Sequence, residues 1–120
     1  MNQPTVSLVR CDDYALERVE QALLRLLEPL GGMGALVRAG QRVVLKPNLV
    51  RAMAPELAAT THPALVAAVA RQVMAIGAQA IIADSAGGPF TRGVLKNLYH
   101  KTGMACNCRS ASAGAWMMGP

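Results

Sequence analysis

Between residues 42 and 84, two short apolar runs flank one long apolar run, and this pattern constrains the fold more than any other feature of the chain. "RVVLK" (42–46) and "QAIIAD" (79–84) are short and apolar in the middle, which is typical of strands covered on both faces. "TTHPALVAAVARQVMAIGA" (60–78) has the length of a helix. A strand, a helix and a strand in this order imply parallel strands joined by a right-handed crossover. The predicted fold class is therefore α/β, with strands alternating with helices in a mainly parallel sheet that the helices cover.

The same alternation extends to both sides of this unit. "TVSLVRC" (5–11) predicts a first strand, and apolar residues spaced by three and four between 14 and 30 predict an amphipathic helix after it. "TRGVLKNLYHKTG" (91–103) predicts a last helix. The expected N-caps are Asp12 or Asp13 for the first helix, Thr61 or His62 for the second and Thr91 for the last. The residues expected to end these helices are the "GGMG" glycines, Gly77 and Gly103, in the same order.

The character of the sequence changes after Met104. Residues 105–120 are rich in small residues and have no period, so we expect an irregular tail with no further strand. We interpret residues 1–104 as the N-terminal part of an α/β domain, and residues 105–120 as a non-native or frame-shifted tail. A three-stranded unit of this kind exposes apolar faces, through which copies of the chain could form an oligomer.

Composition argues against several classes of partner. The net charge of +5 permits nucleic-acid binding, but the basic residues are scattered and only 3% of residues are aromatic. We therefore expect no nucleic-acid partner. The first ten residues lack the pattern of a signal peptide, and Arg71 and Gln72 interrupt the longest apolar run. We expect no membrane span and a cytoplasmic location.

The three cysteines indicate neither a disulfide framework nor a metal site. Cys11, Cys106 and Cys108 form an odd set, which agrees with a reducing compartment. Cys106 and Cys108 could contribute two metal ligands, but two thiolates make only half of a zinc or cluster site. Incidental cysteines are the simpler interpretation, so we assign no metal to this chain.

Polar residues follow the two short strands at the point where each one ends. Lys46 can meet a phosphate or carboxylate as a point charge, and Asn48 points to the same side if the chain stays extended. A solvated lysine and an ordinary turn-forming asparagine are the alternatives. Asp84 can bind a cation or a hydroxyl group or act as a base, and Ser85 follows it. The alternative role of Asp84 is to cap the next turn.

"TTHP" brings further polar groups to the start of the second helix. A helix N-terminus gathers free N–H groups and partial positive charge, which suits an anion and lowers the pKa of His62. His62 could therefore ligate a metal or transfer a proton, while Thr61 could bind the ligand or simply cap the helix. Because parallel sheets collect ligands at the carboxyl ends of their strands, we predict one site there. Its predicted members are His62 and Asp84 as catalytic groups and Lys46, Asn48, Thr61 and Ser85 as ligand-binding groups.

Three motifs in order carry a family resemblance. "VVLKPNLV", "TTHPALVAAVARQV" and "GAQAIIADSAGGPFTRGVLKNLYHKTGM" resemble the family named domain of unknown function 362, which has a "KPN" strand end, a "TTHP" helix start and a "GDSPGG"-like loop. The resemblance covers residues 5–104. Ala86 stands where the family usually has proline, a departure that loosens the loop without removing a functional group.

The resemblance implies an anaerobe-type cytoplasmic protein linked to redox or cluster chemistry. In many members the α/β domain is followed by a ferredoxin-type module with four-iron four-sulfur clusters, and the domain itself continues beyond the "TGM" stretch. This chain has no "CxxCxxCxxxCP" run, so the cluster is expected only in a full-length relative and no cofactor in this chain. The implied partners are a small anionic ligand and a ferredoxin-type module.

The preferred hypothesis is an α/β domain that binds an anionic or metal-bound ligand at its strand ends. In this hypothesis Lys46 and Asn48 hold the negative group, His62 ligates or transfers a proton, and Asp84 with Ser85 holds a cation or hydroxyl group. Two alternatives stay open: a phosphate-handling enzyme, such as a phosphotransferase or hydrolase without a redox role, and an inactive truncated fragment.

Overall fold

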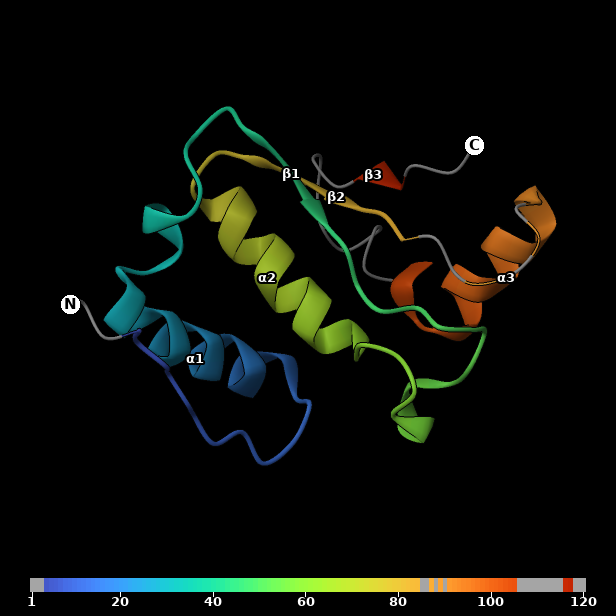
Figure 1. The fold of residues 1–120 in the computed structure, drawn as a ribbon, viewed down its shortest axis with the longest axis horizontal. Coiled ribbons are helices and arrows are strands. Elements are labelled where there is room, and N and C mark those ends of the chain that lie inside the picture. The colour runs from blue at the N-terminus through green and yellow to red at the C-terminus, as the bar shows by residue number, and fades with distance from the viewer. Residues whose placement is uncertain (1–3, 85–86, 88, 90, 106–115, 118–120) are drawn as a thin grey trace.

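The computed structural model of the protein describes residues 4–84, 87, 89, 91–105 and 116–117. Helices and strands alternate along these residues, and the α/β class predicted from the sequence is confirmed (Figure 1). The main elements are α1 (Leu16–Leu27), β1 (Arg42–Leu45), α2 (Pro63–Ala75), β2 (Gln79–Ile82), α3 (Arg92–Lys101) and β3 (Trp116–Met117). Short 3₁₀ turns occur at Glu28–Leu30 (η1), Met33–Ala35 (η2) and Pro55–Leu57 (η3).

The described strands form one parallel sheet in the order β1-β2-β3. Arg42 lies opposite Gln79 at one end of the β1–β2 pair, and Leu45 lies opposite Ile82 at the other. Both strands therefore end at the same edge of the sheet. The prediction that no strand follows Met104 is wrong, because Trp116–Met117 pairs with β2. Two residues are too few for a period to show in the sequence.

The two long helices pack against each other. α2 packs on β1 and β2, and α1 packs on α2 rather than directly on the sheet (Figure 1). Small residues make this close packing possible: Ala68 of α2 is fully buried against α1, and Ala70 and Ala80 are buried between α2 and the sheet. A further core cluster lies under α3 and includes Leu49, Ile82 and Met104.

Two of the three predicted caps are confirmed. His62 Nδ1 accepts the N–H of Ala64 at 3.2 Å at the start of α2, and Thr91 Oγ1 accepts the N–H of Val94 at 3.3 Å at the start of α3. The predicted cap of the first helix is wrong, because Ala15 occupies the N-cap position and has no side chain that could cap. Asp13 Oδ1 instead accepts the N–H of Ala15 at 3.0 Å, in the turn that precedes the helix.

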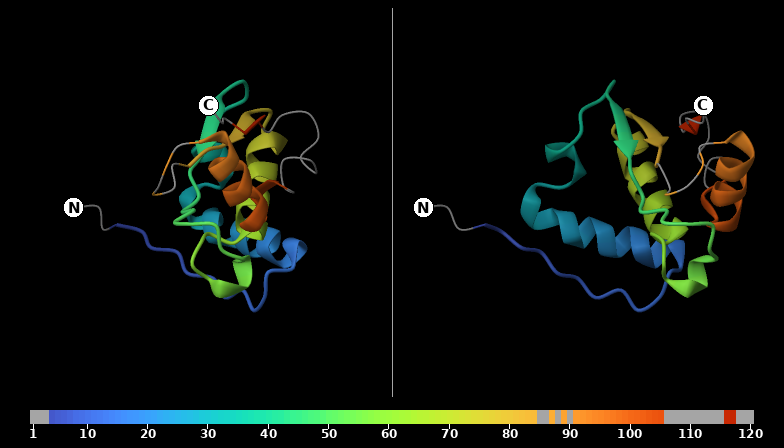
Figure 2. Two further views of the ribbon diagram at one scale, coloured as in Figure 1. Left: turned by 90° about the vertical axis from the view of Figure 1, so that its right-hand side faces the viewer. Right: turned by 45° about the vertical axis from the view of Figure 1, so that its right-hand side comes forward.

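The strand predicted at residues 5–11 is absent from the structure. This segment is extended and leaves the body of the molecule, as Figure 2 shows. Val6 and Leu8 are 88% and 94% exposed. A short run of alternating apolar residues is stable as a strand only when a neighbouring strand pairs with it, and this segment has no such neighbour.

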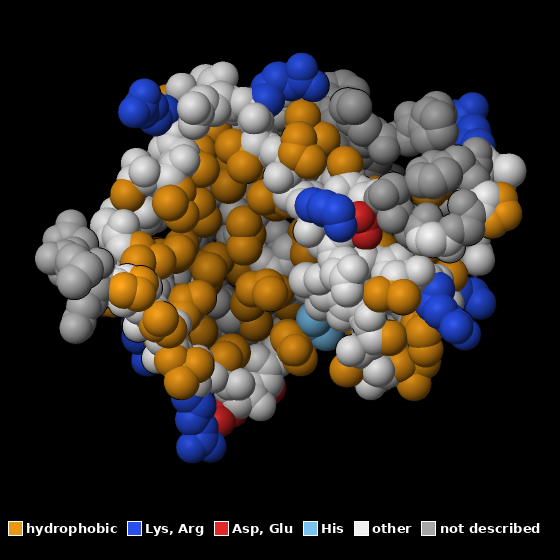
Figure 3. Space-filling view, viewed as in Figure 1, with side chains coloured by type: hydrophobic (Ala, Val, Ile, Leu, Met, Phe, Trp, Pro, Cys, Tyr) orange, Lys and Arg blue, Asp and Glu red, His pale blue; other side chains and the backbone are white. Residues whose placement is uncertain are grey.

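The coverage predicted for β1 on both faces is also wrong. The side chain of Val44 is 60% exposed, whereas Val43 and Leu45 are partly buried against the core. β1 is therefore covered on one face only. Figure 3 shows a hollowed area beside β1, over α1 and α2, in which hydrophobic side chains gather.

Candidate functional site

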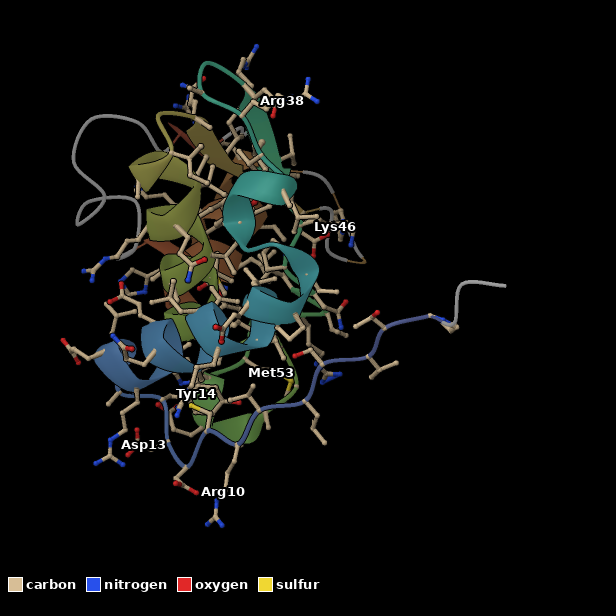
Figure 4. The ribbon with its side chains drawn as sticks, turned by 90° about the vertical axis from the view of Figure 1, so that its left-hand side faces the viewer. Arg10, Asp13, Tyr14, Arg38, Lys46 and Met53 are labelled. Carbon is tan, nitrogen blue, oxygen red and sulfur yellow. The ribbon has the colours of Figure 1, made fainter. Side chains whose placement is uncertain are left out.

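The end of β1 presents a cation at the edge of the sheet. β1 ends at Leu45, and Lys46 follows it with its side chain 68% exposed. Pro47 is buried and has no N–H, so the chain leaves the ladder at this point. Lys46 Nζ lies 2.9 Å from Asp84 Oδ1. Figure 4 shows Lys46 at the surface of the molecule, where its ammonium group can contact solvent.

Asp84 links three parts of the fold. It follows the end of β2, and its side chain is only 3% exposed. Asp84 Oδ2 accepts the N–H of Leu49 at 2.8 Å, and the backbone N–H of Asp84 donates to the hydroxyl of Tyr99 at 3.1 Å. One carboxylate therefore connects the turn after β1 to the end of β2, and the same residue contacts α3.

The arrangement of this ion pair is asymmetric, because its anion is buried and its cation is exposed. A carboxylate taken out of water requires compensating charge and hydrogen bonds. Lys46 supplies the charge and Leu49 supplies a hydrogen bond. The ammonium group pays little desolvation penalty, and Asp84 fixes its direction. A cation held in this way is oriented before any ligand arrives.

Asn48 and Thr61 join the turn after β1 to the chain that enters α2. The N–H of Asn48 donates to Thr61 Oγ1 at 2.9 Å, and the N–H of Thr61 donates to the carbonyl of Asn48 at 3.2 Å. The Thr61 hydroxyl therefore holds the backbone of this turn and is not the cap of α2. Asn48 itself is exposed, so its side chain is available at the same edge as Lys46.

His62 takes part in a different set of contacts. Its ring stacks on Tyr14, with the ring centroids 3.7 Å apart and the planes 13° from parallel. Burial lowers the pKa of His62, and the nearby charge of Glu56 opposes this effect. The imidazole is therefore mainly neutral at pH 7, with Nδ1 accepting the bond from Ala64.

The predicted site residues make two sets of contacts, which adjoin each other at Thr61 and His62. Lys46, Asn48, Thr61 and Asp84 belong to one connected network at the strand ends. Figure 4 shows Tyr14, on which His62 stacks, well apart from Lys46. Ser85 lies outside the described residues, so its predicted role stays a prediction.

Sequence reasoning missed the two tyrosines that contact the predicted site residues. Tyr99 lies within the helix predicted at residues 91–103, and its hydroxyl accepts the backbone N–H of Asp84. A buried tyrosine hydroxyl needs a polar partner, and this requirement is the one signal in the sequence that could have pointed to a contact. Tyr14 is the first residue of the range 14–30 in which the sequence predicts a helix, and that pattern does not indicate its contact with His62.

Two searches of the described residues gave no positive result. No group of three or more His, Cys, Asp or Glu side chains in this part of the chain is close enough to hold a metal ion. In the same residues, no helix has the length and hydropathy needed to span a bilayer.

Comparison with known proteins identifies the family. The sequence model of the family described as "Domain of unknown function (DUF362)" matches residues 43–118. The chain belongs to this family. The matched range contains Lys46 and Asp84 and extends into the segment after Met104 that was expected to be irregular.

One curated relative of this DUF362 chain is the "Thylakoid-associated protein sll1697" of Synechocystis sp. (strain ATCC 27184 / PCC 6803 / Kazusa). The two are 43% identical over 93 residues, which is 78% of this chain and 29% of the relative. The chain therefore spans less than a third of the length of that relative. No solved structure matches the chain significantly.

Proposed function

We propose that this DUF362 domain binds a small anionic ligand at the carboxyl ends of β1 and β2, with Lys46 as the main ligand-binding group. The observation that carries the proposal is the asymmetry of the ion pair: Lys46 is 68% exposed, while its partner Asp84 is 3% exposed. An ordinary surface lysine moves freely and keeps its charge in water. Lys46 instead projects from a strand end in a direction that a buried carboxylate determines.

The N–H donors of Lys46 favour an oxygen-rich anion as the ligand. An ammonium group has three N–H donors, and a single contact to Asp84 Oδ1 leaves donors directed toward solvent. The exposed amide of Asn48 lies in the turn that follows, and the contacts with Thr61 brace that turn. A phosphate or carboxylate could therefore meet Lys46 and Asn48 together. In this arrangement Asp84 positions Lys46 and does not itself contact the anion.

The proposal also concerns the longer protein in which this domain works. In the family that the sequence resembles, a ferredoxin-type module with a four-iron four-sulfur cluster often follows the α/β domain. We propose that the domain works beside such a module in a longer cytoplasmic protein, and that any cluster belongs to that module. The ligand site and the cluster are then separate parts of one protein.

The test is binding of inorganic phosphate, followed by NMR through the backbone amide signals of Lys46, Asn48 and Leu49. The variants are Lys46→Met, which keeps the aliphatic stem without the charge, and Lys96→Met, which removes an exposed charge from α3 as a matched control. We expect saturable shifts in the wild-type protein and in the control, and none in Lys46→Met. Equal shifts in all three proteins would refute the site.

A second variant distinguishes a loss of phosphate binding from a loss of folding. Lys46→Met leaves a buried carboxylate without its cation, which destabilises the site. The double variant Lys46→Met/Asp84→Asn removes both charges and keeps an oxygen that can accept the N–H of Leu49. It should be folded and should not bind phosphate. Phosphate binding by the folded double variant would show that Lys46 is not the ligand-binding group.

A further inference from the structure

We propose that residues 5–9 of this chain dock on the free edge of β1 as an additional parallel strand and cover the apolar hollow beside it. The segment and the edge are both present in the structure but do not touch. The sequence pattern of the segment and the position of the turn that follows it fit this edge. The proposal concerns the sheet and does not depend on the proposed function.

The edge of β1 is open. β1 is the end strand in the order of the described strands and pairs with β2 on one side only. An edge strand presents a row of backbone N–H and C=O groups that can pair with another strand. Val43 and Leu45 are only partly buried on the face toward α2. The hydrophobic hollow in Figure 3 lies next to this edge.

Residues 5–9 have the composition of the missing strand. Val6 and Leu8 alternate with Thr5 and Ser7, and Val9 follows, which is the pattern of a strand at the side of a sheet. Val6 and Leu8 are 88% and 94% exposed, so two large apolar side chains of the same face remain in water. Docking against the hollow would remove this apolar surface from water.

The positions of the helices favour a strand at this place. A right-handed crossover lays its helix over the two strands that it joins. α2 joins β1 to β2 and packs on both, while α1 packs beside α2. α1 therefore lies where the crossover from a strand at residues 5–9 to β1 would put it. Two consecutive crossovers in the same direction place both helices on one face of the sheet.

The chain that follows residues 5–9 is already tied to the edge of the sheet at which β1 ends. Tyr14 stacks on His62 at the start of α2, and the adjacent Thr61 bonds to Asn48 just after β1. The start of α1 is thus tied to the carboxyl end of β1, which is where a parallel strand at residues 5–9 must finish. The chain between them is short, so the segment of the same chain fits this edge better than the segment of a second copy.

The ion pairs made by the turn that follows the segment are weak. Arg10 pairs with Asp12 at 2.6 Å, and Arg18 pairs with Asp13 at 2.9 Å, but all four side chains are largely exposed. Ion pairs at such positions contribute little to stability because water and salt screen them. The turn at residues 10–13 can therefore change direction at little cost.

Amide hydrogen exchange of the 120-residue chain tests the proposal. Docking predicts that the amides of residues 6–9 exchange at least about tenfold more slowly than in an unstructured peptide of the same sequence. The double variant Val6→Asp/Leu8→Asp should lose this protection, whereas Thr5→Asp, on the other face of the segment, should keep most of it. Exchange at the unstructured rate in the wild-type protein would overturn the proposal.

The same experiment, repeated over a range of protein concentrations, separates the two possible sources of the strand. Docking within one chain gives protection that does not depend on concentration, and light scattering then reports a monomer with residues 6–9 protected. Protection that disappears on dilution, together with a dimer at high concentration, would overturn the proposal in favour of strand exchange between copies.

Discussion

Asp84 should be a main determinant of stability at the strand ends, and replacing it should separate its two roles. Leu49 is 0% exposed, and its N–H donates to Asp84 Oδ2 at 2.8 Å. Asp84→Ala removes this acceptor and leaves a buried donor without a partner, which costs about 1–3 kcal/mol. The ion pair adds at most about 1 kcal/mol, because Lys46 is 68% exposed and its charge is screened. The expected loss of unfolding free energy for Asp84→Ala is therefore about 1–4 kcal/mol.

Asp84→Asn is the discriminating variant. It keeps an oxygen for the N–H of Leu49 and removes only the charge, so its expected cost is about 1 kcal/mol. Urea unfolding followed by circular dichroism at neutral pH measures both values. Asp12→Ala is the matched control, since Asp12 also pairs with a cation but its side chain is 59% exposed. The control should lie within about 0.5 kcal/mol of the wild-type protein. A cost for Asp84→Ala as small as that of the control would refute the reasoning, and so would equal costs for Asp84→Ala and Asp84→Asn.

Three further predictions address other parts of the fold. Protonation of His62 should destabilise the protein: burial lowers its pKa, so the unfolded chain binds the proton more readily, and stability should fall as the pH drops through 6.5, the ordinary pKa of histidine. His62→Asn keeps a capping oxygen, and its denaturation midpoint should depend less on pH; an unchanged dependence would contradict the assignment. Thr61→Val should cost about 1 kcal/mol in urea unfolding, because the N–H of Asn48 loses its acceptor, whereas a neutral result would show that water replaces the hydroxyl. Gly103→Ala should lower the melting temperature, because Gly103 has φ +76° and an added Cβ would lie 3.1 Å from Pro63 Cγ. Gly93→Ala in α3 should raise the melting temperature, because alanine has a higher helix propensity than glycine. The opposite order of the two melting temperatures would refute both arguments.

The sequence predicts the central unit of the fold well because local signals agree there. The apolar runs of β1 and β2, proline at the start of α2 and Gly77 after its end all favour the same strand, helix and strand. The carboxyl ends of parallel strands meet at one edge, so Lys46 and Asp84 could be predicted as neighbours without any structure.

The remaining features depend on contacts that no local pattern encodes. The stacking of His62 on Tyr14 joins the start of α2 to the chain that precedes α1. The contact of Tyr99 with Asp84 is of the same kind. The pattern of residues 5–11 predicts a strand that the structure does not contain, because a strand needs a partner edge and the segment does not reach one.

The most direct measurement of the central claim observes the Lys46 side chain itself. The ¹³Cε NMR signal of each lysine can be followed in the ¹³C-lysine-labelled protein while inorganic phosphate is added at constant ionic strength. Lys46 should shift and saturate, and the signals of Lys96 and Lys101, both exposed on α3, should change little and without saturation. Small, unsaturating shifts of similar size for all three lysines would contradict the account, because Lys46 would then behave as an ordinary surface cation.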